Sequence, residues 1–363
     1  MKAGIVGLPN VGKSTLFNCL SSAKAQSANF PFCTIEPNVG VVNVPDSRLT
    51  KLEEIVQPVR VQPATVEIVD IAGLVKGASK GEGLGNKFLA NIRECDAIIH
   101  VVRCFDNDNI VHVETTVDPV RDKEIIDFEL QLKDLETVDK RLEKANRAAR
   151  TGDKDAVLEQ ATLKRLKETL ESGASVRSLD FTEKEMVLIN EFQLLTSKPT
   201  LYVCNVDDAS AKNGNAYVEA IKEAVKDEGA EIIILAVATE SDIAELEDYD
   251  EQQIFLEDIG LSEPGAARLI RSAYTLLKQQ TYFTAGVKEV RAWTINVGDT
   301  APQAAGVIHT DFEKGFIRAE VMSYSDYVEY GSEAKVKEAD KMRVEGKDYV
   351  VQDGDLMNFR FNV

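Results

Sequence analysis

The chain has 363 residues, enough for two or three domains that each bury a core. Its composition is 44% hydrophobic and 28% charged, with no apolar run near the roughly 20 residues of a membrane helix, which excludes fibrous, low-complexity and membrane-spanning classes. The net charge of −19 argues against a surface built throughout for nucleic acid, although a local basic face is compatible with it.

The N-terminus carries a phosphate-binding loop between a strand and a helix. Residues 7–14 read Gly-Leu-Pro-Asn-Val-Gly-Lys-Ser and follow the apolar strand of residues 3–6. In this pattern backbone N–H groups cradle the phosphates, the lysine reaches the β- and γ-phosphates, and the serine binds Mg²⁺. A chance match in a loop is the alternative. The predicted nucleotide-binding residues here are Asn10, Val11, Gly12, Lys13, Ser14 and Thr15, with Lys13 also catalytic and Ser14 also a metal ligand.

Two further segments fit a switch that depends on the third phosphate. Thr34, within residues 29–40, is predicted to complete the Mg²⁺ shell while a γ-phosphate is present. Residues 70–73 read Asp-Ile-Ala-Gly at the end of the predicted strand 65–70. Asp70 is therefore predicted to hold the metal and Gly73 to contact the γ-phosphate. The glycine-rich loop 74–85 follows and is predicted to change conformation with the bound nucleotide. The alternative is a loop that is merely flexible.

Cysteine usage favours a reduced compartment. The five cysteines show no spacing typical of metal sites or disulfides, and the chain enters a strand directly, so we expect a cytoplasmic protein without a targeting segment. Cys33 lies in the predicted switch segment, where it is either an inert loop residue or a redox-sensitive thiol.

The remaining strands predict an α/β fold. Residues 97–103, 201–205 and 231–237 are apolar runs typical of buried strands in a mostly parallel sheet with helices on both faces. Asn205-Val206-Asp207-Asp208 follows one of them. GTP-binding proteins of this class carry Asn-Lys-x-Asp there, with the aspartate accepting two hydrogen bonds from guanine. Because Val206 replaces the lysine, adenine is predicted instead, bound through Asn205, Val206 and Asp208.

Residues 121–198 change in character. Apolar residues at helical spacing, interrupted at residues 151–153, predict two long antiparallel helices inserted into the sheet domain. Ten basic residues lie along this arm: Lys133, Lys140, Arg141, Lys144, Arg147, Arg150, Lys154, Lys164, Arg165 and Lys167. The arm is either a solvated surface of ion pairs or a projection that touches RNA or a protein partner.

The C-terminal part predicts a second folding unit. A helix is expected over residues 263–283, followed by a β-rich tail with strands at 291–297, 307–309, 315–323, 349–351 and 358–362. The predicted domains are 1–277, including the insert 121–198, and 278–363.

Four segments together resemble one family. The P-loop, residues 29–38, residues 70–79 and the altered motif at 205–208 are similar to the YchF subfamily of Obg-like P-loop NTPases. The resemblance covers the whole chain and implies a G-domain-like fold, a helical insertion and a C-terminal TGS-like domain. It also implies an ATPase that binds GTP more weakly and associates with ribosomes. Mg²⁺ is the cofactor that Ser14, Thr34 and Asp70 predict, and RNA is a further candidate partner, through the arm and the TGS-like domain.

Catalysis is predicted to be slow. Leu74 stands where many GTPases place a glutamine that orients the attacking water. Asn10 either binds K⁺ or stabilises a turn. Two alternatives stay open: a GTPase with relaxed base choice, and a binding module whose hydrolysis is incidental.

Overall fold

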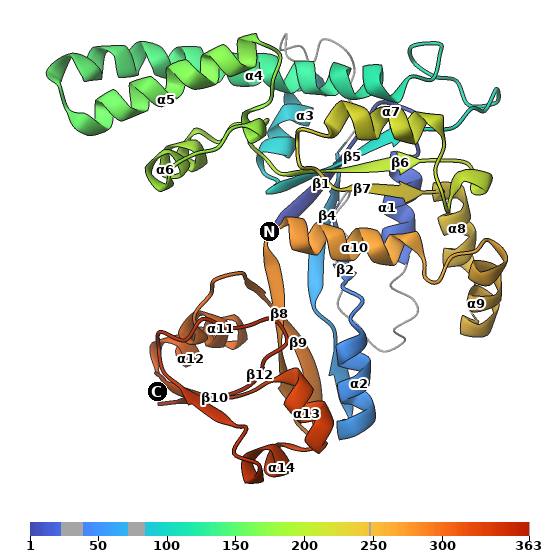
Figure 1. Ribbon diagram of the computed structural model, residues 1–363, viewed down its shortest axis with the longest axis vertical. Helices are drawn as coiled ribbons and strands as arrows, with labels where there is room; N and C mark the ends of the chain where they lie inside the picture. The colour runs from blue at the N-terminus through green and yellow to red at the C-terminus, as the bar shows by residue number, and fades with distance from the viewer. Residues whose placement is uncertain (23–38, 72–83, 247, 363) are drawn as a thin grey trace. The chain divides into compact units, whose positions relative to one another are not determined.

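The computed structural model describes residues 1–22, 39–71, 84–246 and 248–362 (Figure 1). These residues form two compact units. The first contains residues 1–22, 39–40, 67–71 and 84–269 without 247, and the second contains residues 41–66 and 270–362. The domain boundaries predicted from the sequence, at 121–198 and 277, stay predictions.

A six-stranded sheet with the order β2-β4-β1-β5-β6-β7 carries the N-terminal motifs. Its strands are β1 (Lys2–Val6), β2 (Val39–Asn43), β4 (Thr65–Asp70), β5 (Ala97–Arg103), β6 (Thr200–Asn205) and β7 (Ile232–Leu235). The pairs β4–β1, β1–β5, β5–β6 and β6–β7 are parallel. Every residue of β5 and β6 is buried, as central strands covered on both faces require. The predicted α/β P-loop fold is confirmed.

Helices cover this sheet, and Figure 1 shows α4 and α7 on one side and α1 on the other. The helices other than the arm are α1 (Lys13–Ser22), α3 (Leu84–Arg93), α7 (Ala216–Val225), α8 (Val237–Glu245), α9 (Tyr249–Asp258) and α10 (Gly265–Leu276). In the described part of the chain, no helix combines the length and the apolar character needed to span a membrane.

The predicted helical hairpin is confirmed as α4 (Pro119–Ala148) and α5 (Lys154–Glu171). Gly152 turns the chain between them at φ 74, a left-handed conformation that suits glycine. Asp153 then starts α5, because its carboxylate accepts hydrogen bonds from the backbone N–H groups of Asp155 and Ala156. A buried apolar seam joins the two helices to α6 (Glu183–Phe192); its members include Val138, Ala145, Leu163, Leu166 and Ile189.

A buried network of charges fixes the root of this arm. Lys123 Nζ lies 2.6 Å from Asp127 Oδ2 and 2.8 Å from Glu228 Oε1. Arg177 contacts the same two carboxylates, at 3.3 and 3.1 Å. The Tyr202 hydroxyl of β6 donates to Glu228 at 2.9 Å. Burial alone would raise the pKa of Asp127, but Arg177 and Lys123 outweigh it and hold that pKa below its usual range.

The second unit is a mixed sheet with the order β11-β10-β12-β8-β9-β3, packed with short helices. Its strands are β3 (Arg60–Gln62), β8 (Gln279–Ala285), β9 (Glu289–Asn296), β10 (Phe316–Met322), β11 (Arg343–Glu345) and β12 (Leu356–Phe361). Its helices include α2 (Ser47–Val56), α11 (Ala301–Ile308), α12 (Thr310–Lys314), α13 (Tyr324–Tyr330) and α14 (Glu333–Glu338). Tyr282, Ile295, Phe316 and Met357 belong to its core.

Three details of the predicted tail were wrong. The helix expected to continue to residue 283 ends at Leu276, and Lys278 at φ 52 redirects the chain into β8. Residues 307–308 form the end of α11 rather than a strand, and His309 separates α11 from α12; the helix begins after a capping box at Thr300. Residues 349–351 contain a single β-bridge, between Val350 and Thr300, rather than a strand.

Candidate functional site

Lys13 and Asp70, predicted from separate motifs, form an ion pair at the carboxyl edge of the sheet. Lys13 opens α1 and Asp70 is the last residue of β4. Their side chains are only 9% and 14% exposed, so each charge compensates the other in a place where an unpaired charge would be costly. The Ser14 hydroxyl lies 3.4 Å from the second oxygen of Asp70. The lysine expected to bind phosphate and two expected metal ligands therefore lie together.

Asn205 connects the P-loop to the loops that follow β6 and β7. Its side-chain amide donates to the carbonyl oxygen of Val11 at 2.9 Å and accepts from the backbone N–H of Val237 at 3.1 Å. Gly12 packs against this amide at φ 96, and a Cβ at that position would collide with the Asn205 nitrogen. Both functional groups of Asn205 are thus used to hold three loops together. Direct contact of Asn205 with a base stays a prediction.

The two aspartates after Asn205 have different environments. Asp207 caps a short 3-10 helix by accepting from the backbone N–H of Ser210 at 2.9 Å. Asp208 is exposed, and its Oδ1 accepts a hydrogen bond from the hydroxyl of Thr239 on α8. Val206, in the place of the lysine of GTP-binding relatives, is buried. Both aspartates are exposed, and each has one carboxylate oxygen engaged within the protein, so contact of Asp208 with a base stays a prediction.

Asn10 anchors the loop that follows β5. Its side-chain amide donates to the carbonyl oxygen of Val111 at 3.0 Å, and its backbone adopts φ 62. Buried Arg103 holds the same loop from beneath, donating to the carbonyl oxygens of Phe105, Asn107 and Ile110 at 3.1, 3.1 and 2.9 Å. Asn10 thus has the structural role that the sequence allowed. Its binding of K⁺ stays a prediction.

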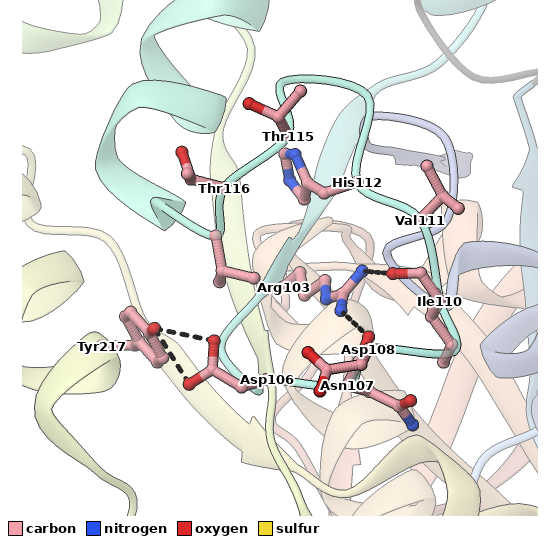
Figure 2. A pocket seen from close by; sticks show the side chains of 11 residues that line it. Arg103, Asp106, Asn107, Asp108, Ile110, Val111, His112, Thr115, Thr116 and Tyr217 are labelled. Carbon is pink, nitrogen blue, oxygen red and sulfur yellow. Dashed lines mark hydrogen bonds between the residues drawn. The ribbon is translucent and has the colours of Figure 1, made fainter.

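A cavity of about 540 Å³ lies within this loop, beside the P-loop (Figure 2). Figure 2 shows Tyr217 beside Asp106 at one edge of the group of lining residues, and the Tyr217 hydroxyl donates to Asp106 Oδ1 at 3.0 Å. His112 uses both ring nitrogens: Nε2 bonds to Asp122 at 2.7 Å and Nδ1 accepts from the N–H of Glu114 at 3.0 Å. Tyr217, Asp106 and His112 are thus engaged within the protein and stabilise the cavity wall.

The oxygen donors near Lys13 suit one magnesium ion. Mg²⁺ is commonly bound by one or two protein oxygens together with substrate phosphates, and Ser14 and Asp70 supply such a pair. Among the residues that the structure describes, no group of three or more His, Cys, Asp or Glu side chains could hold a metal by itself. Thr34, Gly73 and Cys33 lie outside the described residues, so their predicted roles stay predictions.

Comparison with known proteins identifies the family. A model described as a 50S ribosome-binding GTPase matches residues 2–148, and the model YchF-GTPase_C, described as a protein of unknown function, matches residues 279–362. "Ribosome-binding ATPase YchF" of Pasteurella multocida is 57% identical over 362 residues, which cover 100% of this chain and 99% of that one. The chain belongs to the YchF family.

Other YchF proteins agree over the full length. The Bacillus subtilis protein of the same name is 56% identical over 365 residues, covering 100% of both chains. The solved structure of the Schizosaccharomyces pombe YchF GTPase matches with a TM-score of 0.90 and 39% identity, covering 99% of this chain and 97% of that chain. The two bacterial proteins are named ATPases and the yeast protein is named a GTPase, so these names differ in the nucleotide they imply.

Some residues that organise this YchF site carry no sequence motif. Thr239 lies 31 positions after Asp208, and nothing in the sequence links them. Arg103 reads from sequence as the end of a buried strand, and its three carbonyl contacts depend on how residues 105–110 fold back. Such contacts between loops at the end of a parallel sheet follow from strand order.

Proposed function

We propose that this chain is a ribosome-binding ATPase that binds ATP with Mg²⁺ in the P-loop. Two observations carry the proposal. Lys13, Ser14 and Asp70 lie close together, and Asn205 connects the P-loop to the base loop, the segment 206–208 that contains predicted base-binding residues. The names of the bacterial relatives support the same activity. Lys13→Ala should abolish tight ATP binding and hydrolysis. Retention of both would contradict a P-loop site.

Ser14 and Asp70 would hold the magnesium ion, with Thr34 as a further predicted ligand. When bound, the ion neutralises phosphate charge, which is its usual contribution in P-loop proteins. The residues of the chain then have separate tasks. Lys13 contributes a positive charge to the β- and γ-phosphates, and Asn205 keeps the P-loop and the base loop in register. Gly73 is proposed to contact the γ-phosphate.

We infer that ATP is preferred to GTP. Val206 is buried where GTP-binding relatives use a lysine, and it offers no side-chain contact to guanine other than packing. The test is a competition titration of both nucleotides against a fluorescent analogue. ATP should bind more tightly. GTP binding tighter by tenfold or more, about 1.4 kcal/mol, would favour the alternative of a GTPase with relaxed base choice.

The tip of the helical arm supports contact with ribosomal RNA. Within the described residues, Lys133, Lys140, Arg165 and Lys167 are paired with carboxylates. By contrast, the structure gives no ion pair in its described part for four cations between positions 144 and 154: Lys144, Arg147, Arg150 and Lys154. Phosphate backbones bind such free cations, with an affinity that falls as salt rises. RNA contact through the TGS-like domain stays a prediction.

Ribosome co-sedimentation tests this surface. Arg147→Gln with Arg150→Gln should weaken association and reduce its salt dependence. Lys140→Gln with Lys167→Gln removes the same charge from paired positions and should have a smaller effect. Equal effects would argue against the tip. If Lys13→Ala leaves association unchanged with and without nucleotide, the chain is a binding module whose hydrolysis is incidental.

A further inference from the structure

A second cavity, of about 600 Å³, lies at the root of the arm within the first unit. Its wall comes from the first part of α4 (residues 121–131), the turn after α5 (residues 173–178) and the end of α7 (residues 224–228). Phe128 of α4 lines this cavity and is 57% exposed, so much of an apolar side chain is left in contact with water. The volume suits a small ligand or one or two side chains of a partner.

The charges that line this cavity leave a negative surplus. Four carboxylates and two cations contribute to its wall. Both cations are already paired with carboxylates. Two of the lining carboxylates, Asp127 and Glu228, belong to the buried network at the root and are balanced there. The other two, Glu124 and Asp227, are exposed and take part in no ion pair among the residues that the structure describes.

Two helix ends add to the negative potential of this cavity. Both α5 and α7 end at its wall, because residues 173–175 follow α5 closely and residues 224–228 include the last turn of α7. The C-terminal end of a helix carries a partial negative charge, so a carboxylate is disfavoured there and a cation is favoured. Asp227 stands in such a place, just after the end of α7. A positive group in the cavity would relieve that repulsion.

An arginine side chain matches this set of groups. A guanidinium group is attracted to the face of an aromatic ring, and two of its N–H groups can donate in parallel to one carboxylate. Its aliphatic stem can cover apolar surface such as Phe128. Nucleic acid suits the cavity less well, because the same carboxylates repel phosphates. The cavity therefore favours a basic protein segment.

We propose that this cavity is a docking site for a basic protein segment, which inserts an arginine between Phe128 and the carboxylates of Glu124 and Asp227. The inference rests on the proposed function in one respect, because it takes the segment to belong to a protein of the ribosome. The arm then carries two surfaces of opposite charge, the cationic tip for RNA and this cavity for protein. Along α4, Phe128 and Arg147 are about 28 Å apart at about 1.5 Å per residue, so one region of a ribosome can meet both.

A photo-crosslinker at position 128 tests which kind of molecule meets the cavity. Phe128→p-benzoylphenylalanine keeps an aromatic ring there, and the full chain is irradiated on purified ribosomes. The expected product joins position 128 to a ribosomal protein, within a segment rich in arginine and lysine that mass spectrometry locates. The same photo-residue at Val187, which is 60% exposed on α6, is the control and should not give that product. A product with ribosomal RNA from position 128, or no product from a variant that still co-sediments, would overturn the inference.

A fluorescent peptide of six arginines measures the contributions of charge and ring without the ribosome. In an anisotropy titration at low salt, Glu124→Gln with Asp227→Asn should weaken its binding about tenfold, because two unpaired carboxylates are lost. Glu257→Gln with Asp258→Asn removes the same charge from another exposed helix end, that of α9, and should weaken binding less than about twofold. Phe128→Leu keeps an apolar side chain without the ring and should weaken binding about threefold. Equal weakening by the two double variants, or unchanged binding by Phe128→Leu, would show the inference to be wrong.

The failure of the proposed function looks different. If the wild-type chain does not co-sediment with ribosomes, the ribosome-binding assignment fails, and the peptide titration alone then decides whether the cavity takes a basic segment. If the wild-type chain co-sediments but position 128 reacts with RNA, ribosome binding stands and the docking site is wrong. If the chain neither co-sediments nor distinguishes the two double variants in the titration, both are wrong.

Discussion

The side chain of Asn205 joins Val11 of the P-loop to Val237 at the start of α8. It is 4% exposed, and its amide nitrogen and oxygen are both engaged. One of the three residues predicted from sequence to bind the base is thus also a clamp between the parts of the site that would contact phosphate and base. Movement of one loop has to be accommodated by the others.

Asn205→Ala should weaken ATP and GTP binding alike, by about tenfold or more. It leaves the Val11 carbonyl and the Val237 N–H without partners in a buried place, at roughly 1–3 kcal/mol for each. Calorimetric titration with both nucleotides measures the effect. Asp207→Asn is the control, because asparagine caps as well as aspartate and should leave both affinities unchanged. A selective loss of one nucleotide would show that Asn205 contacts the base instead.

Asp70→Asn should have opposite effects with and without magnesium. In EDTA, the variant should bind ATP more tightly than wild type, because Lys13 is released from its ion pair and a negative charge near the phosphates is gone. With Mg²⁺, the gain in affinity that the ion gives should shrink, because a ligand is lost. Binding titrations under both conditions give the two signs. An equal loss in both would argue against Asp70 as a metal ligand.

His100 should make the protein less stable in mild acid. Burial lowers the pKa of His100 on β5 to about 4. Between about pH 6.5 and 4 the His100 imidazole is protonated in the unfolded chain but stays neutral in the folded chain. Stability is therefore fully present above pH 6.5 and falls by about 3 kcal/mol as the pH drops toward 4.

Urea unfolding at several pH values measures this slope. His100→Phe keeps a ring against Tyr202, whose centroid lies 5.4 Å from that of His100, and should flatten the slope in this window. His309→Gln alters a side chain that is 61% exposed and should retain it. A wild-type slope in His100→Phe would mean that other groups carry the acid sensitivity.

Arg177→Met should destabilise the first unit by about 3–5 kcal/mol. Asp127 and Glu228 would each lose a partner in a buried network, and leaving a buried charge uncompensated is costly. Thermal unfolding measures the loss. Arg150→Met at the arm tip is the matched control and should leave the melting temperature nearly unchanged. Adding Glu228→Gln to Arg177→Met should recover part of the stability if the charge imbalance is the cause.

The sequence was sufficient where local pattern decides the structure. The strands ending at Asp70 and Arg103 were predicted with their observed ends, because an uninterrupted apolar run or alternation is typical of strands in such a sheet. The two arm helices were predicted because their spacing is helical and Gly152 interrupts it. Lys13 is predicted to bind phosphate because its glycine pattern is physically demanding; the structure pairs it with Asp70, and phosphate binding stays a prediction.

Long-range contacts explain what could not be predicted. Residues 41–66 pair and pack with the C-terminal sheet, through Arg60 against Glu289 and Arg48 against Asp353, although they precede it by more than 200 positions. The helical form of residues 301–308 depends on a cap at Thr300 and a buried alanine face, whereas the apolar residues near its end also suit a strand. The pairing of Thr239 with Asp208 depends on adjacent strands.

The four free cations at the arm tip give an acidic protein a positive end. At a net charge of −19, the rest of the chain is repelled by a polyanion while the tip is attracted to it. The first encounter with an RNA surface would then be oriented, with the tip arriving before the body. Such steering raises the rate of association and weakens as added salt shortens the Debye length. The arm would thus select the approach before any nucleotide-dependent contact forms.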